Sequence, residues 1–225
     1  MDHFERELDT LKVRLLQMAE RAETAVLSAL QALLNRDSGL ALQVKENDRV
    51  IDRFEIEIDD LGIQQLTKAP LAADLRLITG ITKIAHNLER IGDEAAKIAR
   101  RADDLSGEPA ISVKLDIPAM ADLTLDMLKT AVEAFDHRDT ALARGVLPRD
   151  KEVDLFNRQV HNILAQFMAE NPYTIQRCLH WLVVSKSLER IADHATNIAE
   201  GVVYLYEGRD IRHTDAKNKP AEVTA

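Results

Sequence analysis

The sequence predicts an all-α protein made of two tandem three-helix bundles that are related by internal duplication. Gly and Pro number only 8 and 6 among 225 residues, too few to punctuate the short strands of a β-sandwich or barrel. Six segments place apolar residues three or four positions apart, which is the spacing of one helix face. The second half of the chain also repeats motifs of the first half.

Residues 1–104 form the predicted first bundle. Its first helix has an apolar seam that begins at Leu8, and the cap-forming residues 35–38 end this helix. The second helix stops at Pro70, because proline lacks the backbone N–H that a helix needs. The third helix ends near Arg101. A stripe of small residues on it would let another helix approach closely: Ala85, Gly92, Ala96 and Ala99.

Residues 105–116 are the predicted linker between the bundles, because Gly107 and Pro109 interrupt the helical pattern there. Residues 117–208 form the predicted second bundle. The polar residues 209–225 lack any apolar pattern, and we expect them to be a mobile C-terminal tail.

The second bundle also contains three predicted helices. Pro118 suits the first turn of the fourth helix. The fifth helix ends at Asn171 and Pro172. The sixth helix has the strictest apolar seam of the chain: Trp181, Val184, Leu188, Ile191, Ala195, Ile198, Val202 and Leu205.

Two sets of matching residues indicate the duplication. The segment LERIGDEAAKIAR at 88–100 is identical to LERIADHATNIAE at 188–200 in eight of thirteen positions. Three residues of the second helix recur 102 positions later: Asp48, Asp52 and Phe54 match Asp150, Asp154 and Phe156. We therefore predict a tandem duplication of one three-helix unit.

Composition excludes several classes of function. Lys and Arg total 29 against 38 Asp and Glu, so the net charge of −9 disfavours nucleic-acid binding. No run approaches the ~18 apolar residues that cross a bilayer, so we expect no direct membrane insertion. The N-terminus lacks the basic and apolar regions of a secretory signal, which predicts an intracellular protein. The lone Cys178 has apolar neighbours and is expected to be a packed thiol.

Each half carries two acidic pairs spaced four residues apart, which places both carboxylates of a pair on one helix face. The first quartet is Asp48, Asp52, Glu89 and Asp93, and the second quartet is Asp150, Asp154, Glu189 and Asp193.

Residue numbering predicts that each quartet lies at one level. In a hairpin of two antiparallel helices, two residues lie at the same height when they are equally far from the turn. The sum of their residue numbers is then twice the number at the centre of the turn. Asp48 with Asp93 and Asp52 with Glu89 both total 141, which centres the hairpin between Pro70 and Leu71. The two corresponding pairs of the second quartet both total 343, which centres that hairpin between Asn171 and Pro172, where the fifth helix ends.

Four level carboxylates repel one another, and a bound cation would offset that cost. Carboxylates suit iron, manganese, magnesium, calcium or zinc, and the spacing does not select among these ions. Such sites would lie on the outer surface of each bundle. A solvated, ion-paired helix face is the alternative, because Arg90 and Lys97 lie three and four residues from Asp93. Arg190 precedes Asp193 in the same way.

The histidines add little to this interpretation. His194 is expected to be solvated or at the edge of the core, since one residue turns a helix by about 100° away from Asp193. His86, His161 and His180 look isolated, and none follows a Glu by three residues as in di-iron bundles. Nucleotide-binding, hydrolase and zinc-protease motifs are missing as well, so we do not expect an enzyme.

Two long stretches carry a family resemblance. They are PLAADLRLITGITKIAHNLERIGDEAAKIAR from Pro70 to Arg100 and CLHWLVVSKSLERIADHATNIAEGVVYLYEG from Cys178 to Gly208. Both resemble the PhoU family, the accessory regulators of bacterial phosphate uptake, over nearly the whole chain. The resemblance implies a PhoU-like fold of two similar three-helix bundles. It also implies multinuclear metal clusters at Glu/Asp-x-x-x-Asp signatures, which here are the carboxylates of the two quartets.

The resemblance further implies a cytoplasmic negative regulator of phosphate-starvation signalling and of phosphate-specific ABC transport, acting by protein contact. The implied partners are a sensor histidine kinase and the ATPase subunit of the transporter, which would place the chain at the inner membrane face. A homodimer is also implied. The alternative is a carboxylate-bridged helical-bundle metalloenzyme, which should bury its metals, whereas an adaptor tolerates exposed clusters.

Overall fold

The computed structural model describes residues 3–69 and 71–212, and all regular structure within these ranges is helical. The elements in chain order are α1 (His3–Asn35), α2 (Ser38–Leu66), α3 (Ala72–Ser106), α4 (Ile117–His137), α5 (Thr140–Val146), η1 (Leu147–Arg149), α6 (Asp150–Glu170), η2 (Pro172–Thr174) and α7 (Ile175–Glu207). None of the described helices is long and apolar enough to cross a membrane. The predicted all-α class is confirmed.

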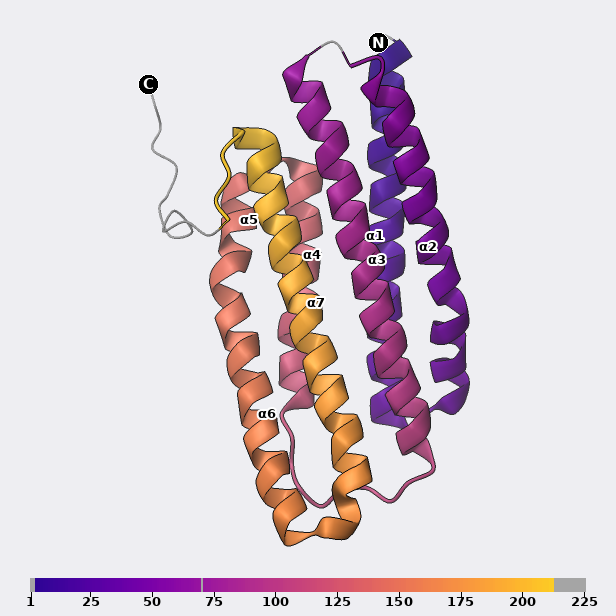
Figure 1. Cartoon of the computed structure of the whole chain (residues 1–225), viewed down its shortest axis with the longest axis vertical. Coiled ribbons are helices and arrows are strands. Elements are labelled where there is room, and N and C mark those ends of the chain that lie inside the picture. The colour runs from indigo at the N-terminus through magenta and orange to yellow at the C-terminus, as the bar shows by residue number, and fades with distance from the viewer. Residues whose placement is uncertain (1–2, 70, 213–225) are drawn as a thin grey trace.

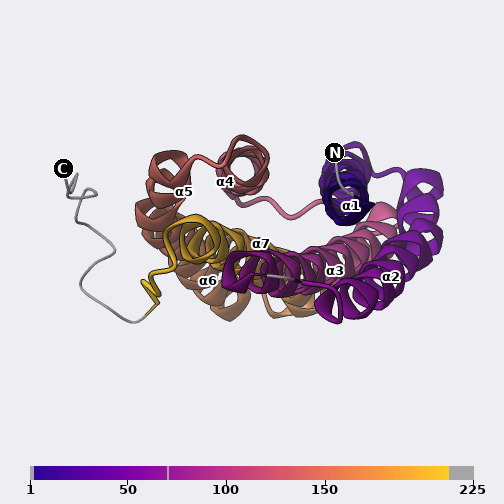
Figure 2. The same ribbon diagram turned by 90° about the horizontal axis from the view of Figure 1, so that it is seen from above.

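The helices form two bundles that lie side by side. The first bundle packs α1 and α2 on α3, and the second packs α4, α5 and α6 on α7. Helices α3 and α7 also pack against each other and join the bundles at the centre of the molecule (Figure 1). Seen from above, α2, α3, α7 and α6 follow one curved layer, with α1 and α4 on the other side (Figure 2).

The duplication is visible in the backbone as well as in the sequence. Arg36 after α1 and Arg138 after α4 both adopt left-handed backbone conformations, with φ 57° in each case. Asp37 and Asp139 follow them and cap the next helices, since each Oδ1 accepts a hydrogen bond of 2.9 Å from a backbone N–H three residues on. These caps begin α2 and α5 at equivalent positions.

The interface between α3 and α7 repeats one polar contact with approximate twofold symmetry. Ser187 donates a hydrogen bond of 2.7 Å to Glu94, and His194 lies 2.9 Å from the side-chain oxygen of Asn87. Asn87 and Glu94 of the first repeat occupy the positions of Ser187 and His194 in the second. Each contact therefore joins one position of a repeat to the other position of its partner repeat, and the interface contains this contact twice.

Close packing also depends on glycine. A Cβ atom on Gly80 of α3 would lie 2.2 Å from Leu205 of α7, so only glycine admits this contact without movement of the leucine. All four residues of the predicted small stripe are buried. Gly92 faces α2, because a Cβ atom there would lie 2.8 Å from Ile51.

The structure differs from the predicted boundaries at two places. Helix α3 continues to Ser106, two residues into the predicted linker, and Leu105 in its last turn is buried. Ile211 falls in the segment that we expected to be a mobile tail, yet it is only 1% exposed. Its burial shows that an apolar residue can anchor a polar segment. Residues 213–225 of the predicted tail lie outside the described residues.

A third difference lies between α4 and α6. The sequence pattern did not predict the short helix α5 or the 3₁₀ turn η1. Pro148 in η1 stands where the first repeat has Glu46, and its missing N–H interrupts the helix that runs continuously through α2. The sixth predicted seam is buried along α7, apart from Trp181 at its start, which is only partly buried.

Candidate metal centre

The first quartet lies between α2 and α3, with Asp48 and Asp52 on α2 and Glu89 and Asp93 on α3. Asp48 Oδ1 lies 3.3 Å from the point that a Cβ atom of Gly92 would occupy. Because Gly92 adjoins Asp93, the carboxylate of Asp48 reaches the level on α3 that the numbering predicted.

Burial and the repulsion of neighbouring carboxylates raise the pKa of two residues in the first quartet. The pKa of Asp48 rises to about 6, first because the carboxylate is partly buried and then because Asp52 and Asp93 are close. Burial followed by the charge of Asp93 raises the pKa of Glu89. The four carboxylates therefore form one electrostatic group.

In the second quartet, between α6 and α7, the same two causes raise the pKa of one residue. Burial raises the pKa of Asp193 to about 6, and the charges of Glu189, Asp150 and Asp154 add to the effect. Asp150 also accepts a hydrogen bond of 3.4 Å from Thr196. The charges of each quartet thus act on one another within their own repeat, although within the described residues neither quartet brings three ligand atoms within 4.8 Å of one another.

Only part of the expected ion pairing occurs. Arg90 lies 3.5 Å from Asp93 and 3.3 Å from Glu89. Arg190 and Lys97, which we considered as partners for the quartets, instead pair with Glu94 at 3.2 and 2.8 Å. The Lys97 pair is local, since the two residues are three apart on α3, whereas Arg190 reaches Glu94 from α7 because Glu94 is buried where the two helices meet.

Glu94 is a charged residue that the sequence analysis did not single out. Burial alone would raise its pKa, but hydrogen bonds from Lys97, Ser187 and Arg190 outweigh burial and lower it. Nothing in its local sequence separates Glu94 from exposed acids. Its role depends on the packing of the two repeats.

One oxygen at the same position of each repeat lacks a hydrogen bond. Glu89 Oε2 and Glu189 Oε2 are both buried and accept none. Each lies near a cation instead, at 3.3 Å from Arg90 Nε and 2.5 Å from Lys186 Nζ. These oxygens are suited to a positively charged partner.

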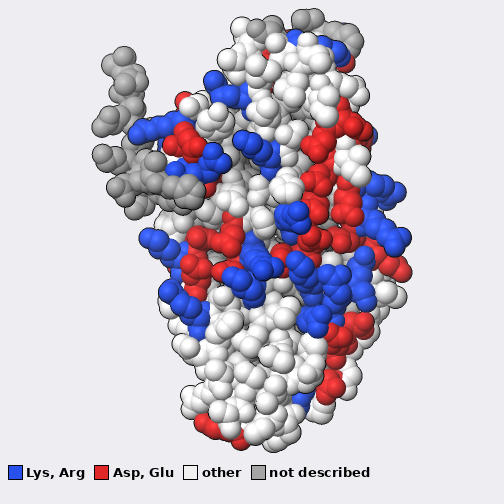
Figure 3. Space-filling model, viewed as in Figure 1, with Lys and Arg blue, Asp and Glu red and all other residues white. Residues whose placement is uncertain are grey.

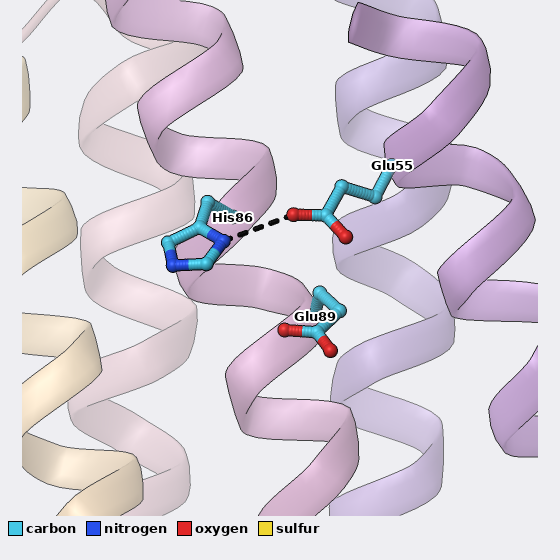
Figure 4. Close-up of side chains that lie close together, drawn as sticks. All are labelled: Glu55, His86 and Glu89. Carbon is cyan, nitrogen blue, oxygen red and sulfur yellow. Dashed lines mark hydrogen bonds and ion pairs between the residues drawn. The ribbon is translucent and has the colours of Figure 1, made fainter.

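The tightest set of potential metal ligands is not a complete quartet. Within the described part of the chain, one group of three or more His, Cys, Asp or Glu side chains brings ligand atoms within 4.8 Å of one another: Glu55, His86 and Glu89. Figure 4 shows Glu55 on α2 facing His86 and Glu89 on α3. The metal-binding role of the eight quartet carboxylates stays a prediction.

His86, which we predicted to be isolated, contacts a carboxylate, so that prediction was wrong. His86 Nδ1 lies 3.0 Å from Glu55 Oε1. The numbers of these two residues also total 141, so the rule that aligned the first quartet contained the signal. We missed it because the rule was applied to carboxylates only.

The other singled-out residues have structural surroundings. His194 is partly buried, as expected at a core edge, and burial lowers its pKa. His180 is not isolated either, since its ring lies 3.2 Å from Arg101 across the α3–α7 interface. The thiol of Cys178 is buried, which confirms the prediction.

Charge is concentrated on one face of the molecule. Acidic and basic side chains gather at mid-height over α2, α3, α7 and α6, while the lower end of this face is largely uncharged (Figure 3). Both quartets belong to helices of this layer. A single surface therefore carries the candidate sites of both repeats.

Comparison with known proteins identifies similar sequences over almost the whole chain. The family model described as the PhoU domain matches residues 15–102 and 117–202. A phosphate-specific transport system accessory protein PhoU homolog from Pseudomonas putida is 41% identical over 222 residues, covering 98% of this chain and 87% of that protein. Its counterpart from Aquifex aeolicus is 37% identical, covering 95% of this chain and 97% of that protein.

Solved structures agree with this similarity. The crystal structure of PhoU from Pseudomonas aeruginosa matches with a TM-score of 0.89 and 40% identity, covering 92% of this chain and all of that chain. The phosphate transport system regulatory protein PhoU from Streptococcus pneumoniae matches with a TM-score of 0.83 and 25% identity, covering 93% of this chain and 99% of that chain.

Proposed function

This chain belongs to the PhoU family, and from that premise we propose that it is a cytoplasmic negative regulator of phosphate-starvation signalling and of phosphate-specific ABC transport. The observation that carries the proposal is the match to accessory proteins of phosphate transport along 98% of the chain, with both repeats included. These relatives are named as accessory proteins, which supports a regulatory role without catalysis.

The proposed regulation acts by protein contact. Its partners are a sensor histidine kinase and the ATPase subunit of the phosphate transporter, and the protein is proposed to be a homodimer. The charged surface over α2, α3, α7 and α6 offers a contact face with acidic and basic groups interspersed (Figure 3). Such a surface favours selective and salt-dependent association.

We also propose that each quartet binds metal ions. The donor set fits, because carboxylate oxygens are hard ligands and a cation would relieve the repulsion that raises the pKa of Asp48 and Asp193. The buried Oε2 atom of Glu89 is a further suitable donor. A bound cation would supply positive charge, and the protein residues would hold it between two helices of each repeat.

Metal analysis combined with partner capture tests both parts of the proposal. We expect the purified chain to carry metal and to retain the kinase and the ATPase subunit. Asp48→Asn with Asp52→Asn should remove the metal held by the first quartet, and Asp150→Asn with Asp154→Asn the metal held by the second quartet. Glu46→Gln, an exposed acid on α2, is the matched control.

The regulatory proposal and the metal-site assignment can be contradicted independently of each other. A chain that captures neither partner under any metal condition would contradict the regulatory proposal. Quartet variants that keep their full metal content would contradict the site assignment and leave the regulatory proposal standing.

A further inference from the structure

The two repeats carry different residues one helical turn from their quartets. The first repeat has Glu55 and His86, whose numbers total 141, and the second has Asn157 and Lys186, whose numbers total 343. These are the totals that align the quartets, so both pairs lie at the same place in their repeats. The first repeat places a carboxylate and an imidazole there, whereas the second repeat places an amide and an ammonium group.

In the first repeat this position presents three metal-binding side chains. Their ligand atoms all lie within 4.8 Å of one another, and His86 Nδ1 is 3.0 Å from Glu55 Oε1. The imidazole and the carboxylate are therefore within hydrogen-bonding distance and face one another, and an ion bound by both would replace this direct contact.

Glu89 completes the group from the adjacent turn of α3. Its Oε2 is buried and accepts no hydrogen bond, and Arg90 Nε faces it at 3.3 Å. The side chain of Glu89 is only 16% exposed, whereas that of His86 is 56% exposed. A bound ion would thus have one sheltered and one solvent-facing side.

The solvent-facing side opens into a groove of about 520 Å³ that Glu55 and His86 help to line. Asp59 also lines this groove and adds negative charge beside Glu55. Water molecules could therefore complete the coordination of an ion held by the three side chains.

In the second repeat a protein cation takes this place. Lys186, the counterpart of His86, lies 2.5 Å from Glu189, the counterpart of Glu89. Asn157, the counterpart of Glu55, accepts a hydrogen bond of 2.8 Å from Ser185. The ammonium group already neutralises the carboxylate, and neither lysine nor asparagine replaces the imidazole and carboxylate ligands.

We propose that Glu55, His86 and Glu89 form a binding site for a divalent first-row transition metal ion, and that only the first repeat has this site. The imidazole ligand favours ions such as Zn²⁺ or Co²⁺ over Mg²⁺ and Ca²⁺, which prefer oxygen ligands alone. The inference rests on the proposed quartet sites only in that Glu89 belongs to both.

Cobalt titration of the chelator-treated full chain tests the proposal, because Co²⁺ reports its ligands by visible absorption. We expect His86→Ala to weaken Co²⁺ binding at this site at least about tenfold and to remove the imidazole-dependent absorption. His161→Ala, which removes an exposed histidine of α6, should leave both unchanged. An unaltered spectrum and affinity in His86→Ala would overturn the proposal, as would absence of Co²⁺ and Zn²⁺ binding in the unaltered chain.

A second variant tests the restriction to one repeat. Asn157→Glu combined with Lys186→His should add one further equivalent of Co²⁺ with a similar spectrum. A folded variant without this gain would overturn the explanation from Lys186. Asp48→Asn with Asp52→Asn separates the two proposals, since it alters the first quartet and should leave the His86-dependent absorption in place.

Discussion

The two repeats share a backbone plan but use charge differently. In the first repeat His86 and Glu55 lie next to the quartet carboxylates, and in the second repeat Lys186 and Asn157 take the equivalent positions. The first repeat thus places an imidazole and a further carboxylate beside its quartet, while the second repeat places the ammonium group of Lys186 there. Duplication preserved the positions of the side chains, and later substitutions changed what those positions can bind.

The interface between the repeats shows the same divergence. Glu94 and His194 occupy equivalent positions, yet Glu94 gathers Ser187 and Arg190 as partners whereas His194 contacts Asn87. One side of the approximate twofold axis is a buried charged cluster, and the other is a contact between an imidazole and an amide. This asymmetry predicts unequal mutational costs.

The largest effect should come from Glu94. Glu94→Ala removes three hydrogen bonds to a buried carboxylate and should lower the free energy of unfolding by about 2 kcal/mol, as measured by urea titration at pH 7. The equivalent change His194→Ala removes a single hydrogen bond and should cost about 1 kcal/mol. Equal costs for the two variants would contradict the asymmetry.

The helix caps should show an intermediate and equal effect. Asp37→Ala and Asp139→Ala each remove one hydrogen bond to the backbone and should each cost about 1 kcal/mol in the same titration. Asp37→Asn and Asp139→Asn keep a capping oxygen and serve as controls. A large difference between the two alanine variants would show that the break at Pro148 changes how the cap contributes.

Removing the charge of the quartet acid with the highest pKa in each repeat should stabilise the protein, by less than the preceding variants destabilise it. In the presence of a chelator at pH 7, Asp48→Asn and Asp193→Asn should each stabilise the protein by about 0.5 kcal/mol, the scale of like-charge repulsion on a helix. Thermal unfolding measures the change. Destabilisation by either variant would mean that its carboxylate makes favourable contacts that outweigh repulsion.

The pH dependence should follow from these same acids. The folded protein binds protons at Asp48 and Asp193 up to about pH 6, whereas ordinary aspartates lose them near pH 3.8, so their contribution to stability falls as pH rises from about 4 to about 6. The pKa of Glu94 is lowered, so its contribution is lost on acidification. The double variant Asp48→Asn with Asp193→Asn should fall less in stability than the unaltered chain across this range in chelator. The same decline in both would contradict the raised pKa values.

Several features of the site were predictable because helices convert sequence spacing into position. Four-residue spacing placed Asp48 and Asp52 on one face, and the hairpin total brought Asp48 to the level of Asp93. The contact between His86 and Glu55 was predictable in the same way, because their numbers also total 141, but we missed it. The partner of Arg190 was not predictable, because Glu94 lies on a helix that is distant from Arg190 in sequence.

By itself, the sequence determined the helical class, the duplicated unit, the family and the level of the carboxylates. The family was indicated by a resemblance of two long stretches, and the other features follow from periodicity or from residues that recur at a regular offset. The tertiary structure alone decided which cation faces each acid, that the repeats pack side by side through α3 and α7, and that Ile211 is buried. Local spacing fixes where a side chain stands on its own helix, but desolvation and charge pairing depend on what the neighbouring helix places against it.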